Sequence, residues 1–426
     1  MEPTGQIPPQ PWMAAPETRR LMAAFAEAGA EARFIGGCVR DAILKRQVKD
    51  IDIATPEPPQ RVMELLDAAG IHVIPTGLSH GTVTAVIEHM HFEITTLRVD
   101  VETDGRRARV AFTDDWTQDA ARRDFTINTM SCDLAGNVYD PYDGLEDLAK
   151  GYIRFVGHAE TRITEDVLRL LRFFRFLAEY GRYPVNREAL AACRKMAHRL
   201  PTLSGERVRG ELFRILTAPN PADTITKMRG ERVLQHVLDE AGDVGRLRMI
   251  EWLVERAVKL DDIDVDPVRR LAALLRPDLT AAAVQGVAER LKFSNAERKH
   301  LLGMCAAEPL ISADMDDRAV RQACHGVGGS MVADRAMLAW AGELALEARL
   351  PQERTQAWLH IVQSALEWPG VTFPLRGRDV QALGVNYGPR IGALLKAVET
   401  WWSGEDFQPD REACLAKLGA LFEDGT

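Results

Sequence analysis

Two aspartates separated by one apolar residue are the first feature of this sequence that could do chemistry. They are Asp50 and Asp52 in the segment KDIDI, residues 49–53. On a β-strand, alternate side chains project from the same face, so both carboxylates would lie together. Neighbouring carboxylates repel each other, and a hard cation such as Mg²⁺ relieves that repulsion while it holds a nucleoside triphosphate. The same pattern is more often a polar surface strand or turn, so it needs support from other residues.

A glycine pair lies shortly before these aspartates. The segment FIGGCVRD, residues 34–41, has the pattern of a strand, a glycine turn and the start of a helix. Glycines let backbone NH groups approach phosphate oxygens closely, and a helix N-terminus and Arg40 add positive charge. A glycine pair is usually only a turn. Because Gly37 lies 13 residues ahead of Asp50, however, the two motifs together describe half of a triphosphate site.

A third motif, RRDFTIN at residues 122–128, concentrates charged and hydrogen-bonding groups around two apolar residues. We expect Phe125 and Ile127 to anchor the motif in the core. Arg123 and Asn128 would then be available to a ligand. A salt-bridged turn accounts for the same residues equally well.

In a fourth motif, EDVLRLLRFFRF at residues 165–176, charged residues recur every three positions: Asp166, Arg169, Arg172 and Arg175. On one helix they would share a slowly drifting face. An ordinary amphipathic helix has a similar pattern. The functional alternative is base reading. An aspartate that accepts from an exocyclic amino group, beside an arginine that donates to a ring nitrogen, would accept cytosine and adenine and reject uracil and guanine.

The predicted secondary structure changes from mainly strands to helices near residue 155. Up to that point the segments ARFIGG, DIDIAT, IHVIPTG, TVTAVIE, FEITTLR, RVAFT and NVYDPYD predict short strands of a mixed sheet. A loose arm over the first 20 residues and an amphipathic helix over residues 18–30 precede them. Beyond residue 155, helical periodicity predicts an all-α remainder with boundaries near residues 219 and 350. We therefore expect an α+β chain of four parts: 1–155, 156–218, 219–350 and 351–426.

Composition narrows the class of protein. The chain has 426 residues and a net charge of -9, but residues 150–217 contain 14 Lys and Arg against 7 Asp and Glu. That basic segment could meet nucleic acid, or it could be a solvated helical face. The six cysteines are far apart and form no CxxC pair, which predicts a reducing, cytoplasmic location. No run of 18 apolar residues and no signal-peptide pattern occurs, so we expect no membrane segment.

In this order and at this spacing, the motifs resemble those of the class II tRNA nucleotidyltransferases, the CCA-adding enzymes, and of their relatives the bacterial poly(A) polymerases. GGCVRD with DID resembles the first catalytic motif of the family, and VETDGRRARVAF, residues 101–112, its flexible loop, with Gly105 as a possible pivot. RRDFTIN resembles the ribose and triphosphate motif, and EDVLRLLR the helix that selects the nucleotide. ERVRGEL, residues 206–212, resembles the motif that braces that helix. The resemblance is clear over residues 31–216.

The resemblance implies a polymerase-β-like nucleotidyltransferase head, then a helical neck that selects the nucleotide, a helical body and a tail that binds tRNA. It implies addition of CCA to the 3′ end of tRNA from CTP and ATP, with Mg²⁺ and with release of pyrophosphate. By the same resemblance Asp50 and Asp52 bind the metal ions, and Gly37 and Arg40 hold the triphosphate. The further nucleotide-binding residues that it implies are Arg123, Asn128, Asp166, Arg169, Arg172 and Arg175, and it leaves the role of Glu93 open.

Three alternatives stay open. A poly(A) polymerase would share the head and neck, although the segment GLSHGTVTAVIEHMH lacks the arginine-rich stretch typical of those enzymes. A partial enzyme would add only CC or only A, although the flexible loop is of full length. A non-catalytic RNA-binding protein would not need both Asp50 and Asp52. No His-Asp dipeptide occurs in the sequence, so we expect no metal-dependent phosphohydrolase activity.

Overall fold

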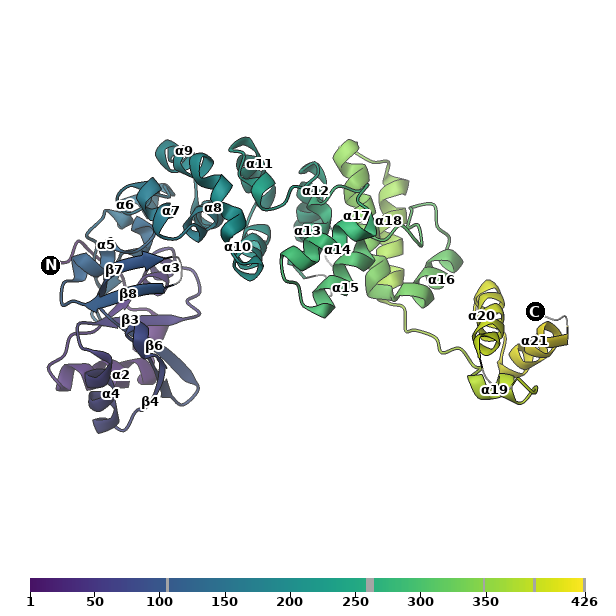
Figure 1. Cartoon of the computed structure of the whole chain (residues 1–426), viewed down its shortest axis with the longest axis horizontal. Helices are drawn as coiled ribbons and strands as arrows, with labels where there is room; N and C mark the ends of the chain where they lie inside the picture. The colour runs from purple at the N-terminus through teal and green to yellow at the C-terminus, as the bar shows by residue number, and fades with distance from the viewer. Residues whose placement is uncertain (105–106, 258–263, 348, 386–387, 424–426) are drawn as a thin grey trace. The chain divides into compact units, whose positions relative to one another are not determined.

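The computed structural model describes residues 1–104, 107–257, 264–347, 349–385 and 388–423, and the chain forms two compact units (Figure 1). One unit contains Met1–Pro219 and Asp223–Asp239, and the other contains Asn220–Ala222 and Glu240–Thr426. The mixed-sheet head lies in the first unit, and the second is helical. The predicted α+β class is therefore confirmed, while the division into four parts stays a prediction.

The head contains an eight-stranded mixed sheet in the order β1-β10-β9-β2-β3-β6-β5-β4. Only β3 and β6 pair in parallel, and the other neighbours are antiparallel. Helices α2 (Pro16–Glu27) and α4 (Pro59–Ala68) pack together, and α4 lies against β4 and β5 (Figure 1). The strands are β1 (Gly5–Gln6), β2 (Arg33–Ile35), β3 (Ile51–Thr55), β4 (His72–Gly77), β5 (Thr82–Ile87), β6 (Met90–Thr96), β9 (Ser131–Cys132) and β10 (Asn137–Tyr139).

The segment that resembles a flexible loop belongs to a separate two-stranded ribbon. Strand β7 (Arg98–Asp104) pairs antiparallel with β8 (Arg107–Phe112). Strand β8 was expected from its alternation, whereas β7 was not. Gly105, the predicted pivot, lies outside the described residues.

The prediction of a loose N-terminal arm is wrong. Strand β1 pairs with β10 at the edge of the sheet, and Ile7 and Met13 are buried. The Trp12 ring meets the Phe34 ring edge-on, with centroids 4.8 Å apart. Three apolar side chains within a Pro- and Gln-rich stretch thus bury enough surface to order it.

The helices of the first 239 residues surround the sheet and continue into the neck. They are α1 (Pro11–Ala14), α2 (Pro16–Glu27), α3 (Gly37–Ile43), α4 (Pro59–Ala68), η1 (Leu78–His80), α5 (Trp116–Ala121), η2 (Thr126–Asn128), α6 (Gly144–Lys150), α7 (Ala159–Glu165), α8 (Leu168–Tyr180), α9 (Arg187–Met196), η3 (Ala197–Thr202), α10 (Gly205–Thr217), α11 (Pro221–Gly230) and η4 (Leu234–His236). The helix predicted over residues 18–30 is confirmed as α2.

A continuous aromatic core joins the head to the neck. The Phe125 ring centroid lies 4.7 Å from that of Phe155 and 5.1 Å from that of Phe176, and the Phe155 and Phe173 rings stack at 5.8 Å. All four side chains are buried. Aromatic contacts of this kind add to the stabilisation from area burial alone. Helix α8 is therefore held against the RRDFTIN motif, as the expected anchoring by Phe125 requires.

The fourth motif is not one continuous helix. Helix α7 ends at Glu165, and Asp166 adopts an extended backbone with φ -147° and ψ 109°. Its carboxylate Oδ1 accepts a hydrogen bond of 3.1 Å from the backbone NH of Leu168. Aspartate often interrupts a helix in this way, because its side chain competes with the backbone carbonyls for the NH groups of the following residues. The prediction that Asp166 shares a helical face with the three arginines is thus wrong, since it precedes their helix.

The second unit is all-α, as predicted. Its helices are α12 (Gly245–Trp252), the π-helix η5 (Leu253–Ala257), α13 (Pro267–Leu274), α14 (Ala281–Arg290), α15 (Asn295–Met304), α16 (Asp317–Val327), α17 (Gly329–Leu346), α18 (Gln352–Leu366), α19 (Gly377–Gln381), α20 (Pro389–Gly404) and α21 (Arg411–Glu423). The last three pack around Trp402 and Leu418, and Arg321 of α16 pairs with Asp406 at 2.6 Å. No described helix has the length and apolar character to span a membrane.

Candidate active site

Carboxylates meet where β3 and β6 run side by side. Asp52 on β3 is the register partner of Glu93 on β6, and Asp50 is exposed one residue before β3 begins. Burial, Glu93 and Asp50 raise the pKa of Asp52 to about 6, and Arg123 opposes the shift. Burial is the largest cause of this shift, and the neighbouring carboxylates add to it.

This donor set fits a divalent metal ion of the magnesium kind. The described residues contain no group of three or more His, Cys, Asp or Glu side chains arranged to hold a metal. Mg²⁺ is commonly held by one or two carboxylates, with water and substrate phosphates completing its shell. Asp50 and Asp52 supply those carboxylates. A cation beside Asp52 would also remove the repulsion that raises its pKa.

The glycine pair forms a tight turn between β2 and α3. Gly36 has φ 63° and ψ -116°, a conformation that side chains rarely tolerate. A Cβ at Gly36 would lie 3.3 Å from Nη1 of Arg123, and one at Gly37 would lie 3.8 Å from Nη2 of Arg40. Two guanidinium groups therefore flank the turn, which is the arrangement that a phosphate requires.

A chain of hydrogen bonds leads from this turn to helix α8. Arg40 Nη1 donates to Asn128 Oδ1 at 2.6 Å, and Asn128 Nδ2 donates to Asp124 Oδ1 at 3.0 Å. Arg172 Nε donates to Asp124 Oδ2 at 2.6 Å. Arg40, Asn128 and Asp124 are each 8% exposed. Burial would raise the pKa of Asp124, but Arg172 and the hydrogen bond from Asn128 outweigh it and lower that pKa.

A second buried carboxylate holds the arginine pair of RRDFTIN. Asp119 on α5 accepts from Arg122 at 2.6 Å and from Arg123 at 3.0 Å. Burial opposes ionisation, yet the two arginines outweigh it and lower the pKa of Asp119. One carboxylate facing two guanidinium groups leaves a net positive charge beside the turn. The sequence reasoning missed both Asp119 and Asp124. Asp119 lies just before the two arginines and Asp124 directly follows them, and this spacing was the signal in the sequence that could have identified them as partners.

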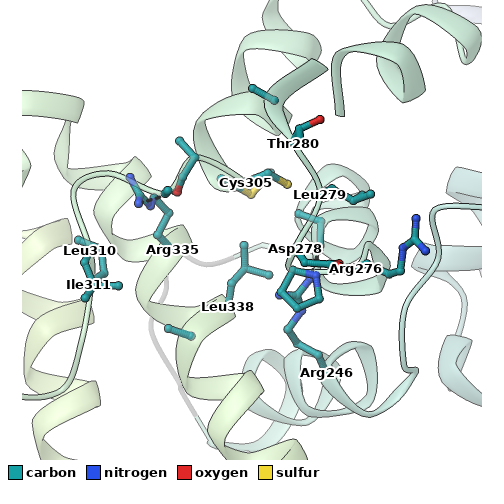
Figure 2. Close-up of a pocket in the computed structure, with 17 residues that line it drawn as sticks. Arg246, Arg276, Asp278, Leu279, Thr280, Cys305, Leu310, Ile311, Arg335 and Leu338 are labelled. Carbon is teal, nitrogen blue, oxygen red and sulfur yellow. Dashed lines mark hydrogen bonds between the residues drawn. The ribbon is translucent and has the colours of Figure 1, made fainter. Parts of the chain in front are cut away.

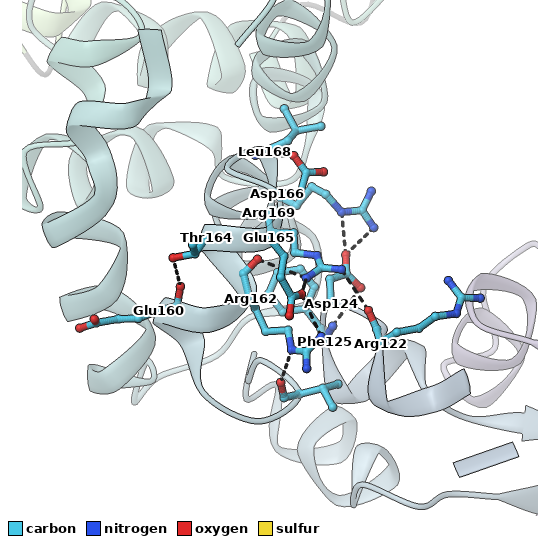
Figure 3. A network of polar contacts seen from close by, with 12 residues as sticks. Arg122, Asp124, Phe125, Glu160, Arg162, Thr164, Glu165, Asp166, Leu168 and Arg169 are labelled. Atoms are coloured by element: carbon cyan, nitrogen blue, oxygen red, sulfur yellow. Dashed lines mark hydrogen bonds and ion pairs between the residues drawn. The ribbon is translucent and has the colours of Figure 1, made fainter. Parts of the chain in front are cut away.

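The two expected base-reading side chains have separate partners. Asp166 Oδ2 accepts from Arg207 Nη2 at 2.7 Å, and Arg169 pairs with Glu165. Figure 3 shows Arg169 and Arg162 converging on Glu165, beside Arg122 and Asp124. No hydrogen bond or ion pair joins the Asp166 and Arg169 side chains where the structure describes them. They lie one turn apart, since the Arg169 backbone NH donates to Asp166 O at 3.0 Å.

Arg175 is placed differently from the other predicted arginines. Its guanidinium lies 3.4 Å from Glu211 of α10, and the two side chains are 8% and 7% exposed. Arg175 Nε and Glu211 Oε2 make no hydrogen bond, and burial lowers the pKa of Arg175. The contact of Arg175 with Glu211 therefore joins α8 to α10. A contact between Arg175 and a nucleotide stays a prediction.

Comparison with known proteins places these motifs in a wider context. Residues 32–154 match the family described as "Poly A polymerase head domain", and residues 183–243 match "Probable RNA and SrmB- binding site of polymerase A". The chain is 33% identical over 400 residues to the mitochondrial CCA tRNA nucleotidyltransferase 1 of Danio rerio, covering 91% of this chain and 87% of the relative. It is 27% identical over 413 residues to the CCA-adding enzyme of Lactococcus lactis, covering 96% of each.

The fold also resembles a solved structure over almost its whole length. The crystal structure of the Bacillus stearothermophilus CCA-adding enzyme in complex with CTP matches with a TM-score of 0.77 at 24% identity. The match covers 97% of this chain and 98% of that one. At this identity the likeness establishes the fold.

Proposed function

The chain belongs to the family of the CCA tRNA nucleotidyltransferases, and from this premise we propose that it completes or repairs the 3′-terminal CCA of tRNA from CTP and ATP, releasing pyrophosphate. One observation of the site supports this most strongly. Arg123 lies beside the glycine turn and also within electrostatic range of Asp52. A phosphate-binding turn and a metal-binding carboxylate are therefore neighbours, as nucleotidyl transfer requires.

We propose that Asp50 and Asp52 hold Mg²⁺, with Glu93 as a third carboxylate beside them. When bound there, Mg²⁺ would lower the pKa of the attacking 3′-hydroxyl and neutralise charge on the departing pyrophosphate. The two aspartates would hold the ion at the start of β3. The register pairing of Asp52 with Glu93, with Asp50 two residues before Asp52, supports this assignment, because it gathers carboxylates at one edge of β3.

Gly37, Arg40, Arg123 and Asn128 then bind the nucleotide's triphosphate and ribose. Arg40 and Arg123 flank the turn, and Gly37 allows close approach of the backbone. Asn128 holds Arg40 in place through its 2.6 Å hydrogen bond. Because these groups are already ordered by buried partners, little reorganisation is needed when the triphosphate arrives.

Asp166 and Arg169 select the base in this proposal, with Arg172 and Arg175 as further nucleotide contacts. Asp166 would accept from the exocyclic amino group of C or A, and Arg169 would donate to the ring nitrogen. Arg207 and Glu165 hold the two side chains apart without substrate. A carboxylate can accept several hydrogen bonds, so Asp166 could keep Arg207 while it reads a base. Arg169 must turn away from Glu165, and this movement would accompany nucleotide binding.

The experiment that tests the function is product sequencing on a tRNA that lacks its 3′-terminal CCA. We expect CC with CTP alone, CCA with CTP and ATP together, and no addition with UTP or GTP. A poly(A) tail with ATP alone would establish the second candidate, a poly(A) polymerase, whose head domain gives its name to the family that residues 32–154 match. Addition of CC or of A only would establish a partial enzyme.

We further propose the four-part division, with residues 1–155 catalytic, 156–218 selecting the nucleotide, 219–350 forming the body and 351–426 binding tRNA. We also propose a cytoplasmic location. All six cysteines are free, and five of them are buried, which suits a reducing compartment. Fractionation of cells that express the tagged chain would test the location. Because one relative is mitochondrial, recovery of the chain in an organelle fraction is the result that would contradict the proposal.

A further inference from the structure

The second unit contains a pocket whose charge the proposed function does not use. Its volume is about 520 Å³, within the range of small-molecule sites. It lies among helices α12, α13, α15 and α17 and the first residue of α14. Arg246, Arg335 and Cys305 line it together with apolar side chains such as Leu338 and Ile311. We call it the arginine pocket. Figure 2 shows Arg246 and Arg335 reaching it from different helices.

Both arginines are bound only to neutral acceptors. Arg246 donates to the backbone oxygens of Ala272 and Ala273 at 2.6 and 2.9 Å. Arg335 donates to those of Ala306 and Glu308 at 2.7 and 2.9 Å. Within the described residues, neither guanidinium forms an ion pair with a carboxylate. These contacts satisfy backbone carbonyl groups at the end of α13 and in the loop that follows α15, but they leave two positive charges in place.

Other arginines of the same unit are neutralised. Arg269 pairs with Asp334 at 2.6 Å, Arg290 pairs with Glu240 at 2.6 Å, and Arg354 pairs with Glu343 at 2.5 Å. An unpaired charge in a partly buried site costs free energy. Arg335 is only 7% exposed. Asp278 and a third arginine, Arg276, also line the pocket, and Glu308 lies within electrostatic range of Arg335. Neither carboxylate forms an ion pair with Arg246 or Arg335 in the described residues. The three arginines of the lining outnumber Asp278, so the arginine pocket keeps a positive charge that an anion from outside the chain would balance.

The thiol of Cys305 is affected by the positive charge of the same two arginines. Burial raises the pKa of its thiol, and Arg246 and Arg335 both oppose that shift. The thiol therefore lies within the electrostatic range of both guanidinium groups. Of the six cysteines only Cys305 is not buried, so its reactivity is a local probe of this pocket.

We propose that the arginine pocket binds a small molecule that carries a phosphate monoester next to an apolar or aromatic part. The guanidinium groups of Arg246 and Arg335 bind the phosphate, since planar NH donors match its oxygens. Leu338 and Ile311 contact the remainder of the ligand. This pocket belongs to the second unit, and the glycine turn belongs to the first.

The test uses the full chain in its native state. N-ethylmaleimide modifies accessible thiols, and peptide mass spectrometry locates the modification at Cys305. With AMP at about ten times its dissociation constant, the modification rate should fall about tenfold, because only the ligand-free fraction reacts. Inorganic phosphate should protect more weakly. Adenosine, which has no phosphate, should give no protection.

Matched variants locate the effect. Ala281 lies on the pocket in the exposed first turn of α14, so Ala281→Glu adds a competing carboxylate with little risk to folding, and Ala281→Gln is its neutral control. We expect AMP protection to be lost in Ala281→Glu and in Arg335→Gln. It should remain in Ala281→Gln and in Arg298→Gln, which changes a half-buried arginine on α15 that does not line the pocket.

Protection that is absent in the wild type, or that persists in a folded Arg335→Gln variant and in Ala281→Glu, would overturn the proposal. A short single-stranded RNA is the third ligand in the series. If it protects Cys305 at a lower phosphate concentration than AMP does, the pocket belongs to an RNA-binding surface and the small-molecule proposal is wrong.

Discussion

Arg172 of the neck donates a hydrogen bond of 2.6 Å to Asp124 of the head, and the other carboxylate oxygen of Asp124 accepts from Asn128. Asn128 in turn holds Arg40 at the glycine turn. A single buried carboxylate thus connects the helix expected to select the nucleotide with the turn expected to hold its phosphates. Nothing in the motif spacing alone required this connection.

Replacing Asp124 with Asn should weaken both stability and nucleotide binding. The change removes the counter-charge of Arg172, and loss of one partner of a largely buried ion pair costs about 3 kcal/mol. Asn128 would lose its buried partner and support Arg40 less firmly, although Asp41 still pairs with Arg40 at 3.0 Å, so the KM for CTP and for ATP should rise together. Urea unfolding and steady-state kinetics measure the two effects. Glu64→Gln, in an exposed pair with Arg61, is the control and should change stability by less than about 0.5 kcal/mol. A normal KM in Asp124→Asn would contradict the connection.

Arg207→Gln should relax base selection while triphosphate binding remains. Arg207 holds Asp166 at 2.7 Å, so its loss frees the carboxylate to adopt other positions. We expect the preference for CTP over UTP to fall by about tenfold or more, with little change in inhibition by pyrophosphate. Competition assays that contain both nucleotides measure this ratio directly. An unchanged ratio would show that Asp166 needs no support from Arg207.

A paired replacement should separate the structural role of Arg175 from a contact with nucleotide. Glu211→Leu alone leaves the buried guanidinium of Arg175 uncompensated and should destabilise by about 3 kcal/mol. The double variant Arg175→Met with Glu211→Leu should recover most of that loss, because the pair already has unsatisfied polar atoms. If the double variant is stable but binds CTP much more weakly, Arg175 also contacts the nucleotide. If binding is unchanged, its role is to join the two helices.

Stability of the second unit should depend on the protonation of His300. The hydrogen bond of 2.6 Å to Asp334 is the main reason that the pKa of His300 is raised. A raised pKa means that the folded state favours the protonated ring. The resulting stabilisation is full below the ordinary histidine pKa of about 6.5 and is lost as pH rises through the folded-state value. The unfolding free energy of wild type minus that of His300→Gln should therefore be larger at about pH 6 than at about pH 9. An equal or reversed difference would contradict this linkage.

The sequence predicted the parts of the fold that have their own periodicity. Strands such as β5, with Val83, Ala85 and Ile87 buried in alternation, and helix α2 are examples. Strands β1 and β9 have two residues each and form only because distant strands pair with them, so no local pattern marks them. The helix break at Asp166 depends on one side-chain hydrogen bond to Leu168, which competes with a helical pattern that otherwise continues.

The candidate site was predictable in its residue types but not in its partners. Asp52, Gly37 and Arg40 lie in motifs whose chemistry is visible in the sequence. Asp119 and Asp124 hold the site's arginines from positions that resemble ordinary salt-bridged turns. Asp119 pairs locally, with arginines three and four residues later. The pairing of Asp124 with Arg172 depends on the packing of α8 on the RRDFTIN motif, because it joins residues 48 positions apart.

The central claim is that one nucleotide reaches both the glycine turn and the start of helix α8. A crystal structure with CTP and a tRNA that lacks its terminal CCA tests it most directly. We predict that the triphosphate lies against Gly37, Arg40 and Arg123, and that the cytosine amino group donates to Asp166. A bound CTP whose base lies away from Asp166 and Arg169 would contradict the account.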